Sequence, residues 1–166
     1  MRAIGRAAAV LAVAAGVAGS VSGVATAAQE DLELRIVTFA GKCLDVEYGS
    51  TDDSARIIQY RCHGGDNQNF TLHAVGGDKV EIRTFAGKCL DVQRASTQDS
   101  AQIIQYRCHG GDNQRFTGEY LGDGKARINT FADGKVLDVK GASTDDAAPI
   151  IQYRWHDGDN QKFSQG

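Results

Sequence analysis

Residues 57–68 read IIQYRCHGGDNQ, and Phe70 follows after one intervening residue. The same letters stand at 103–114, and a close variant, IIQYRWHDGDNQ, stands at 150–161. In both repeats a phenylalanine again follows after one intervening residue. A segment that returns at a regular interval is the signature of a protein built from like structural units. This stretch therefore predicts three equivalent units along one chain.

A second repeated segment precedes the first in every unit. It reads TFAGKCLDV at 38–46 and at 84–92, and TFADGKVLDV at 130–139. The aspartate within it recurs after 46 residues and then after 47, because Asp133 is inserted in the third unit. Two segments that return in the same order indicate that the whole unit, rather than one motif, is repeated.

The repeated units have the composition of β-structure. Their segments are short, rich in β-branched and aromatic residues, and separated by Gly, Asp, Asn and Ser, which is typical of strands joined by turns. In the first unit we expect strands at 34–39, 44–47, 56–60 and 69–74 and turns at 41–42, 49–54 and 64–66. Strands at 79–85 and 125–130 begin the other two units. Four strands per unit predict an all-β fold of about 12 strands.

Three equal units of this size must share a core, because none can bury one by itself. We expect them to close around a pseudo-threefold axis. An open solenoid is the alternative, but it needs polar caps at both ends, and the sequence shows none. A closed, three-lobed barrel is therefore favoured, with lobes at 34–78, 79–124 and 125–166.

The N-terminus is typical of a secretory signal peptide. Two arginines flank the start of the chain, an uncharged apolar run follows at 7–19, and Ala25-Thr26-Ala27 matches a cleavage site. We expect 1–27 to be removed and a domain of 28–166 to be secreted. An uncleaved membrane anchor is the alternative, but the apolar run is shorter than the roughly 20 residues that a membrane-spanning helix needs.

The charge balance excludes some partners. Without the two signal-peptide arginines, 16 Lys and Arg face 21 Asp and Glu, which gives a net charge of −5. An acidic surface without a basic stripe argues against binding nucleic acid, whose phosphates require clusters of Lys and Arg. The chain after residue 27 also contains no apolar segment that predicts a membrane span.

An exported chain with an even number of cysteines predicts disulfides, although four cysteines allow three pairings. The repeat favours Cys43 with Cys62 and Cys89 with Cys108, because each of the first two units then holds one pair at the same spacing. In the third unit both positions change together, to Val136 and Trp155. A zinc site is the alternative, but the sequence has no CxxC motif and exported compartments are oxidising.

The combined motifs resemble those of the ricin B-type lectin family. Each unit has L-D-V near its start, an aromatic residue two positions before the second cysteine position, and N-Q-x-Phe at its end. The family's Q-x-W signature stands here as Q-x-F. The similarity covers Leu34 to Phe163 and implies a β-trefoil, which is a six-stranded barrel capped by three hairpins with a shallow sugar pocket in each lobe.

The resemblance implies a role in sugar binding for five residues of each lobe. An exposed aspartate on a strand would accept hydrogen bonds from neighbouring hydroxyls, and a tyrosine would stack on the apolar face of the sugar. A histidine and an asparagine would add polar contacts, whereas a glutamine would mainly hold the turn by bonding to backbone. The set comprises Asp45, Tyr60, His63, Asn67, Gln68, Asp91, Tyr106, His109, Asn113, Gln114, Asp138, Tyr153, His156, Asn160 and Gln161.

Each of these roles has a structural alternative. The aspartate can cap a local turn by bonding backbone amides, the tyrosine can pack at a rim, and the histidine can be a solvated turn residue. The chain also departs from the family, since Ile58, Ile104 and Ile151 stand where many members have a sugar-contacting glutamine. The glutamine one position later should point to the opposite face of the strand. We expect Phe70, Phe116 and Phe163 in the core.

The resemblance implies a secreted, monomeric lectin for galactose-like or xylan- and arabinan-type glycans, with three weak sites, no cofactor, no metal and no enzyme activity. A glycoside hydrolase needs two differently tuned carboxylates beside one bond, whereas the carboxylates here recur equally in all lobes. One alternative is a β-trefoil inhibitor or protein-binding module, which would need only one distinctive loop. Another is the binding subunit of a separate toxin or glycosidase chain.

Overall fold

The structure is a computed structural model that describes residues 31–166. The expected signal peptide at 1–27 lies outside the described residues. The strands are β1 (Leu32–Leu34), β2 (Ile36–Val37), β3 (Cys43–Val46), β4 (Ile57–Tyr60), β5 (Phe70–Gly76), β6 (Lys79–Thr84), β7 (Cys89–Val92), β8 (Ile103–Tyr106), β9 (Thr117–Gly122), β10 (Lys125–Asn129), β11 (Lys135–Val139), β12 (Ala148–Arg154) and β13 (Phe163–Gln165).

Short 3-10 helices lie between the strands, two in each lobe. They are η1 (Glu47–Gly49), η2 (Asp66–Gln68), η3 (Gln93–Ala95), η4 (Asp112–Gln114), η5 (Lys140–Ala142) and η6 (Asp159–Gln161). The all-β prediction is confirmed, since the described residues contain no α-helix. Over the same part of the chain, none of the helices has the length and apolar character that spanning a bilayer requires.

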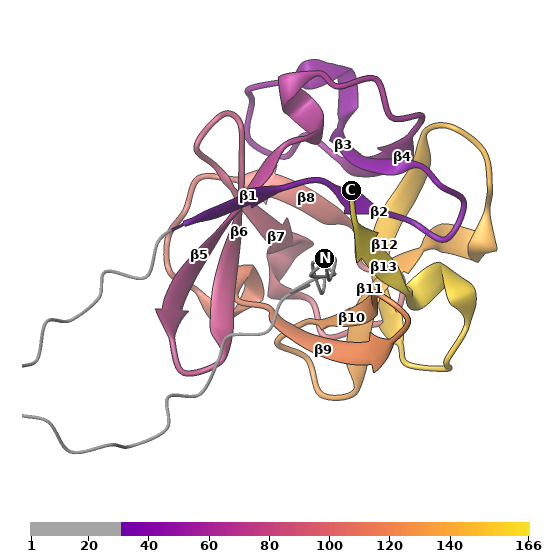
Figure 1. Ribbon diagram of the computed structural model, residues 1–166. Coiled ribbons are helices and arrows are strands. Elements are labelled where there is room, and N and C mark those ends of the chain that lie inside the picture. Colours follow the sequence, from indigo (N-terminus) through magenta and orange to yellow (C-terminus); the bar gives the residue numbers. More distant parts are fainter. Residues whose placement is uncertain (1–30) are drawn as a thin grey trace, which may run out of the picture.

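Six strands close into a barrel, and the ring can be followed in Figure 1. The first barrel strand consists of β1 and β2, of which β1 pairs with β5 and β2 pairs with β13. From β5 the ring continues to β6, then through the bridge between Val80 and Phe116 to the start of β9, then to β10 and to β13. Because the ring returns to its first strand, the edges of the barrel strands are paired.

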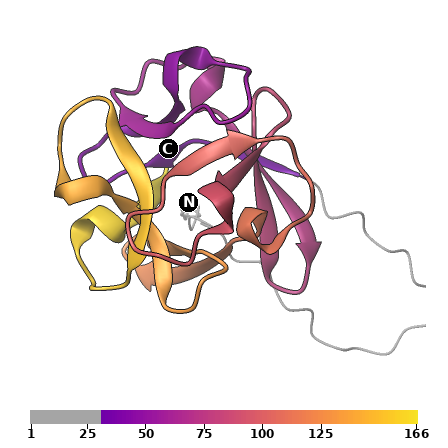
Figure 2. The same ribbon diagram turned by 180° about the vertical axis from the view of Figure 1, so that it is seen from behind.

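Three further hairpins complete the lobes. They are β3–β4, β7–β8 and β11–β12, and they share one register, in which Cys43 faces Tyr60, Cys89 faces Tyr106 and Val136 faces Tyr153. The hairpins also bridge one another in a cycle, through Arg56 and Ile104, Gln102 and Ile151, and Ala148 and Gln59. Figures 1 and 2 show the three lobes from opposite sides. The β-trefoil expected from the resemblance is confirmed.

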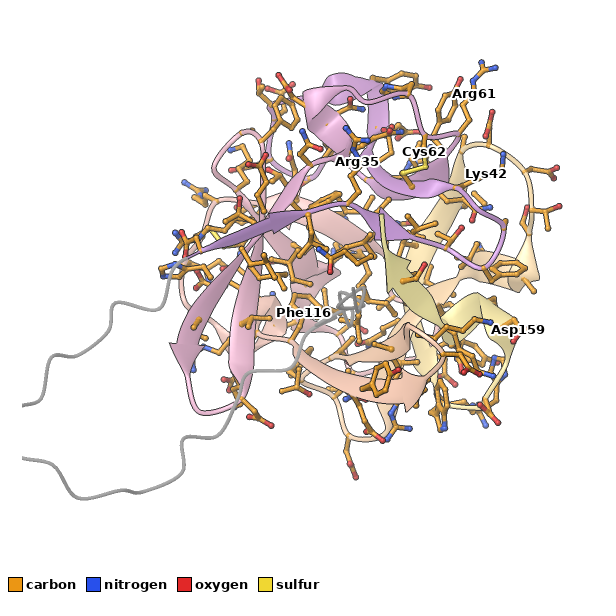
Figure 3. The ribbon with its side chains drawn as sticks, in the orientation of Figure 1. Arg35, Lys42, Arg61, Cys62, Phe116 and Asp159 are labelled. Carbon is orange, nitrogen blue, oxygen red and sulfur yellow. A yellow bond between two sulfur atoms is a disulfide. The ribbon has the colours of Figure 1, made fainter. Side chains whose placement is uncertain are left out.

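The shared core is built from equivalent residues of the three lobes. Phe70, Phe116 and Phe163 are at most 1% exposed, and Figure 3 shows Phe116 lying inside the ring of strands. In β3 both Leu44 and Val46 are fully buried in this core, as strand alternation predicts. The core assignment of the three phenylalanines is therefore confirmed.

The first expected strand is interrupted. Strand β1 begins at Leu32 and ends at Leu34, Arg35 interrupts the pairing, and β2 covers only Ile36 and Val37. The chain then turns, because the Thr38 amide donates to the Lys42 carbonyl at 2.7 Å and the Gly41 amide donates to the Thr38 carbonyl at 2.9 Å. Our strand at 34–39 was therefore wrong in its continuity and its end, and the split explains why 13 strands are present rather than about 12.

The disulfide prediction is confirmed. Cys43 bonds to Cys62 and Cys89 bonds to Cys108. In the third lobe Val136 is buried, and the half-buried Trp155 ring lies under the Arg127 guanidinium, whose carbon is 4.8 Å from the ring centroid. Apolar packing and a cation–π contact thus occupy the position of the bridge.

Ion pairs join each lobe to the next in a closed cycle. Asp146 of the third lobe accepts a hydrogen bond from Lys42 Nζ at 2.6 Å and lies 3.8 Å from Arg61 in the first lobe. Figure 3 shows both basic residues on the edge that faces this third-lobe loop. The other two junctions repeat the arrangement, with Asp53 beside Lys88 and Arg107, and Asp99 beside Lys135 and Arg154. The lysine at each junction lowers the pKa of the aspartate.

Candidate functional site

Each lobe contains a pocket with the same wall. The three pockets measure about 400, 490 and 410 Å³ in chain order, a size suited to a small ligand. An aspartate, a tyrosine, a histidine and an asparagine from the predicted set line every pocket, together with an isoleucine. These residues are Asp45, Ile58, Tyr60, His63 and Asn67, then Asp91, Ile104, Tyr106, His109 and Asn113, then Asp138, Ile151, Tyr153, His156 and Asn160.

The pocket aspartate is buried, and our expectation of an exposed carboxylate was wrong. Asp45 is 3% exposed. Its Oδ1 accepts a hydrogen bond from Asn67 Nδ2 at 2.9 Å, and its Oδ2 accepts one from Gln68 Nε2 at 2.8 Å. Alternation along β3 shows which face the side chain takes, but the chain around η2 folds back over that face. These partners are side chains, not the local backbone amides that a turn-capping aspartate would use.

Burial raises the pKa of this carboxyl in all three lobes. Desolvation is the largest influence on Asp45, Asp91 and Asp138, and the hydrogen bond from the glutamine partly opposes it. A desolvated carboxylate gains from any further donor that reaches it, because water no longer supplies one. A ligand hydroxyl is such a donor.

The glutamine lies behind the aspartate rather than on the pocket wall. Gln68 is fully buried. Its Oε1 accepts from the His63 backbone amide at 2.9 Å, and its Nε2 donates to the Arg61 carbonyl at 3.0 Å as well as to Asp45. Gln114 and Gln161 repeat these bonds. The glutamines therefore hold the turn and orient the aspartate, which is the structural role expected for them.

The histidine is oriented by its own turn. His63 Nδ1 accepts from the Gly65 amide at 3.1 Å, which leaves Nε2 to carry the proton and point to Asp45 Oδ2 at 3.2 Å. Gly65 is needed because a Cβ there would lie 2.7 Å from the histidine ring and 2.8 Å from Asn67 Oδ1. The equivalent glycines, Gly111 and Gly158, meet the same two side chains.

The tyrosine supplies a flat, half-buried wall. The Tyr60 and His63 ring centroids lie 6.1 Å apart at 73°. The Arg61 guanidinium carbon lies 5.3 Å from the Tyr60 centroid, and the same stacking is found at Tyr106 and Tyr153. These contacts hold the ring in place, and a held aromatic ring suits stacking with little loss of side-chain freedom.

The isoleucine and the glutamine that follows it point to opposite faces of the strand, as predicted. Ile58 lines the first pocket. Gln59 is fully buried and donates through Nε2 to the carbonyls of Ser143 and Asp145, at 2.8 and 2.9 Å. Gln105 and Gln152 hold the corresponding loops of the other lobes. The pocket therefore has an apolar wall, and the glutamine joins neighbouring lobes.

Sequence reasoning missed two parts of each pocket. One is a residue from a neighbouring lobe, since Ala147 lines the first pocket, Ser54 the second and Ser100 the third. The other is the short helix after each aspartate strand, namely η1, η3 or η5. The repeated S-T-x-D at 50–53, 96–99 and 143–146 was the available signal, and its first copy lies within the turn expected at 49–54.

Residues 32–163 match the model of the ricin-type beta-trefoil lectin domain. The chain belongs to this family. The family resemblance of the repeated motifs is thus confirmed, and the match covers nearly all of the described residues. Ricin B-type lectins are generally carbohydrate binders rather than enzymes, although some structural neighbours are glycosidase or toxin chains.

The solved structures that are similar to this chain include natural and designed proteins. A designed threefold-symmetric protein is 44% identical, with a TM-score of 0.78 over 80% of this chain and 96% of that one. An exo-beta-1,3-galactanase from Clostridium thermocellum is 36% identical, with a TM-score of 0.78 over 80% of this chain, which spans only 29% of the galactanase. A ricin B-like lectin from Macrolepiota procera, solved with lactose, shares the fold at 19% identity, with a TM-score of 0.68 over 81% and 94% of the two chains. No curated protein matches the chain.

Proposed function

We propose that this ricin B-type lectin is a secreted protein that binds galactose-like glycans through three equivalent sites. The proposal rests mainly on one observation, which is that the same pocket recurs in all three lobes. In each pocket a desolvated aspartate, an asparagine and a histidine lie beside a tyrosine whose ring is fixed by its neighbours. Repetition in every lobe favours this function over an inhibitor, which would need one distinctive loop.

The pocket chemistry fits a sugar with adjacent hydroxyls. The Asp45 carboxylate already accepts from Asn67, Gln68 and His63, which leaves Oδ1 one further lone pair for a sugar hydroxyl. Asn67 donates both amide hydrogens within the protein, to Asp45 and to the Val46 carbonyl, so its Oδ1 is the acceptor for a neighbouring hydroxyl. The apolar face of the sugar ring stacks on Tyr60, and Ile58 contributes apolar contact. The likeness to part of a beta-1,3-galactanase supports galactans as the glycan class.

Three weak sites on one rigid body act together on a glycan-coated surface. A shallow site with a millimolar dissociation constant contributes only about −4 kcal/mol. Joining several such sites raises the overall avidity by about 10²- to 10⁴-fold without new contacts. The lobes are held by the interlobe ion pairs and by Gln59 and its equivalents. Binding to a polymer should therefore far exceed binding to a monosaccharide.

A glycan array and calorimetric titrations with galactose, lactose, xylose and arabinose test the proposal. We expect binding of galactose and lactose, and its loss in the triple variant Asp45→Ala, Asp91→Ala, Asp138→Ala. The triple variant Tyr60→Ala, Tyr106→Ala, Tyr153→Ala should also lose binding, and it leaves the buried hydrogen bonds of the aspartates intact. Circular dichroism establishes that each variant is folded.

Tyr120→Ala is the matched control for the tyrosine variant, because Tyr120 is 57% exposed and lies outside the three pockets. Its glycan affinity should equal that of the unmodified protein. The proposal is wrong if the unmodified protein binds no glycan, or if the folded tyrosine variant binds as tightly as the control.

Glycan affinity should fall on acidification before the protein unfolds. The pKa of each pocket aspartate is raised above 3.8 by burial, so protonation removes the hydroxyl acceptor at a higher pH than for an exposed aspartate. A raised folded-state pKa means that these carboxyls contribute stability below the unfolded pKa and lose it as pH rises through the folded value. Their protonation therefore does not promote unfolding.

For the interlobe aspartates Asp53, Asp99 and Asp146, the pH dependence of stability has the opposite sign. Their pKa is lowered by the adjacent lysine, so their contribution to stability is present above the unfolded pKa and is lost only as pH falls through the lower folded value. Lactose titrations and far-ultraviolet circular dichroism between pH 7 and pH 3 check this order. A single transition shared by binding and unfolding would contradict it.

A further inference from the structure

The three pockets share their inner walls and differ most at one rim. The rim is the short helix that follows the aspartate strand. It reads Glu47-Tyr48-Gly49 in the first lobe, Gln93-Arg94-Ala95 in the second and Lys140-Gly141-Ala142 in the third. The middle residue has a left-handed backbone in each case, with φ of 59°, 60° and 65°. The pockets also differ at the residue from the neighbouring lobe, which is Ala147, Ser54 or Ser100, but the largest differences in size and charge lie at this rim.

Tyr48 is an unusual residue for such a position. A left-handed backbone disfavours residues with a Cβ and suits glycine, the residue that the third lobe has there. The Tyr48 side chain is 94% exposed, so it gains little from packing against residues 31–166. It nevertheless lines the first pocket, together with Tyr60. Folding gives no reason for an aromatic ring at this point, whereas a ligand that extends from the pocket does.

An ion pair also fixes the rim of the first lobe. Arg56 binds the Glu47 carboxylate through two nitrogens, and the Glu47 amide donates to the Arg56 carbonyl at 3.0 Å. The residues at the positions of Arg56 in the other lobes are Gln102 and Pro149, which cannot form this pair. The guanidinium of Arg56 compensates the negative charge of Glu47, and the pairing fixes the backbone that carries Tyr48. In contrast, Arg94 and Lys140 bring cationic groups to the other rims.

We propose that Tyr48 forms a second sugar subsite in the first lobe. In this arrangement the inner pocket holds one sugar of a neutral oligosaccharide, and the Tyr48 ring stacks on the next sugar along the chain. The inference rests on the proposed function, which supplies the sugar in the inner pocket. The first lobe then prefers oligosaccharides, whereas the second and third lobes respond mainly to the single sugar that each pocket contains.

The experiment isolates the first lobe in the full-length chain. Tyr106→Ala with Tyr153→Ala removes the stacking wall of the other two pockets, and calorimetry compares galactose with β-1,3-linked galactotriose. We expect the trisaccharide to bind about 5- to 10-fold more tightly than galactose, the gain from one additional aromatic contact. Adding Tyr48→Gly should reduce that ratio to about one. Glycine suits the left-handed backbone, so thermal stability should not fall.

Two controls separate the possible outcomes. Tyr120→Ala in the same background removes an exposed tyrosine outside the pockets and should keep the ratio. A background with Tyr60→Ala and Tyr106→Ala isolates the third lobe, which has Gly141 at the rim and should show no trisaccharide preference. The subsite is refuted if Tyr48→Gly leaves the ratio unchanged, or weakens both ligands by the same factor. If the unmodified protein binds neither galactose nor galactotriose, the proposed function itself fails, and the subsite with it.

Discussion

Replacing Phe116 with alanine is expected to lower the free energy of unfolding by about 3–5 kcal/mol. The ring is 1% exposed and lies in the closed barrel with its equivalents, Phe70 and Phe163. Barrel closure leaves the surrounding strands little freedom to collapse into the cavity, because each strand is paired on both sides. Equilibrium denaturation in urea measures the loss.

Phe85→Ala is the matched control, because it removes the same side chain from a position that is 38% exposed. It should cost less than half as much as Phe116→Ala. The pseudo-threefold symmetry adds a second check, since Phe70→Ala and Phe163→Ala should each match Phe116→Ala. Equal losses for Phe85 and Phe116 would show that the barrel interior is not the main source of stability.

Removing the second-lobe disulfide by Cys89→Ser with Cys108→Ser is expected to lower the free energy of unfolding by about 3 kcal/mol. The bridge joins residues 19 positions apart, and its loss returns chain entropy to the unfolded state. The equivalent change at Cys43 and Cys62 should have a similar effect, because that bridge closes a loop of the same length. Urea denaturation without reductant measures both.

Reductant provides the control for the disulfide prediction. In excess dithiothreitol the unmodified protein should lose most of its advantage over the serine variants, since its own bridges are then open. Stability that is unaffected by either treatment would contradict the expected role of the bridges. The third lobe has packing at this position instead, with a buried Val136 and Trp155 beneath Arg127, and it should be indifferent to reductant.

Much of the fold follows from the repeat. Because each unit has the same segments, whatever local structure one unit forms the others form too, and only a closed arrangement lets all three share a core. The disulfide pairing follows from the same logic. The strand at 34–39 was misjudged because its end depends on the turn from Thr38 to Lys42, and the apolar pattern continues beyond it.

The composition of the pocket wall was partly predictable. Family resemblance identified the residue types, and strand alternation correctly separated Ile58 from Gln59. Alternation could not show that Asp45 is buried, because the cover comes from the chain around η2, about 20 residues later. Alternation also could not show that Gln68 lies behind Asp45 and affects the pocket only by orienting that carboxylate.

The amino-acid sequence by itself therefore determined the threefold architecture and the disulfides, which follow from the repeat, while the family resemblance of its motifs identified the core phenylalanines and most of the pocket residues. Only the tertiary structure decided how the units meet. Asp146 joins Lys42 across 104 residues, and Ala147 beside it completes the first pocket. The physical reason is closure of the barrel, which brings the third lobe against the first, a contact between units that strand alternation within one unit cannot predict.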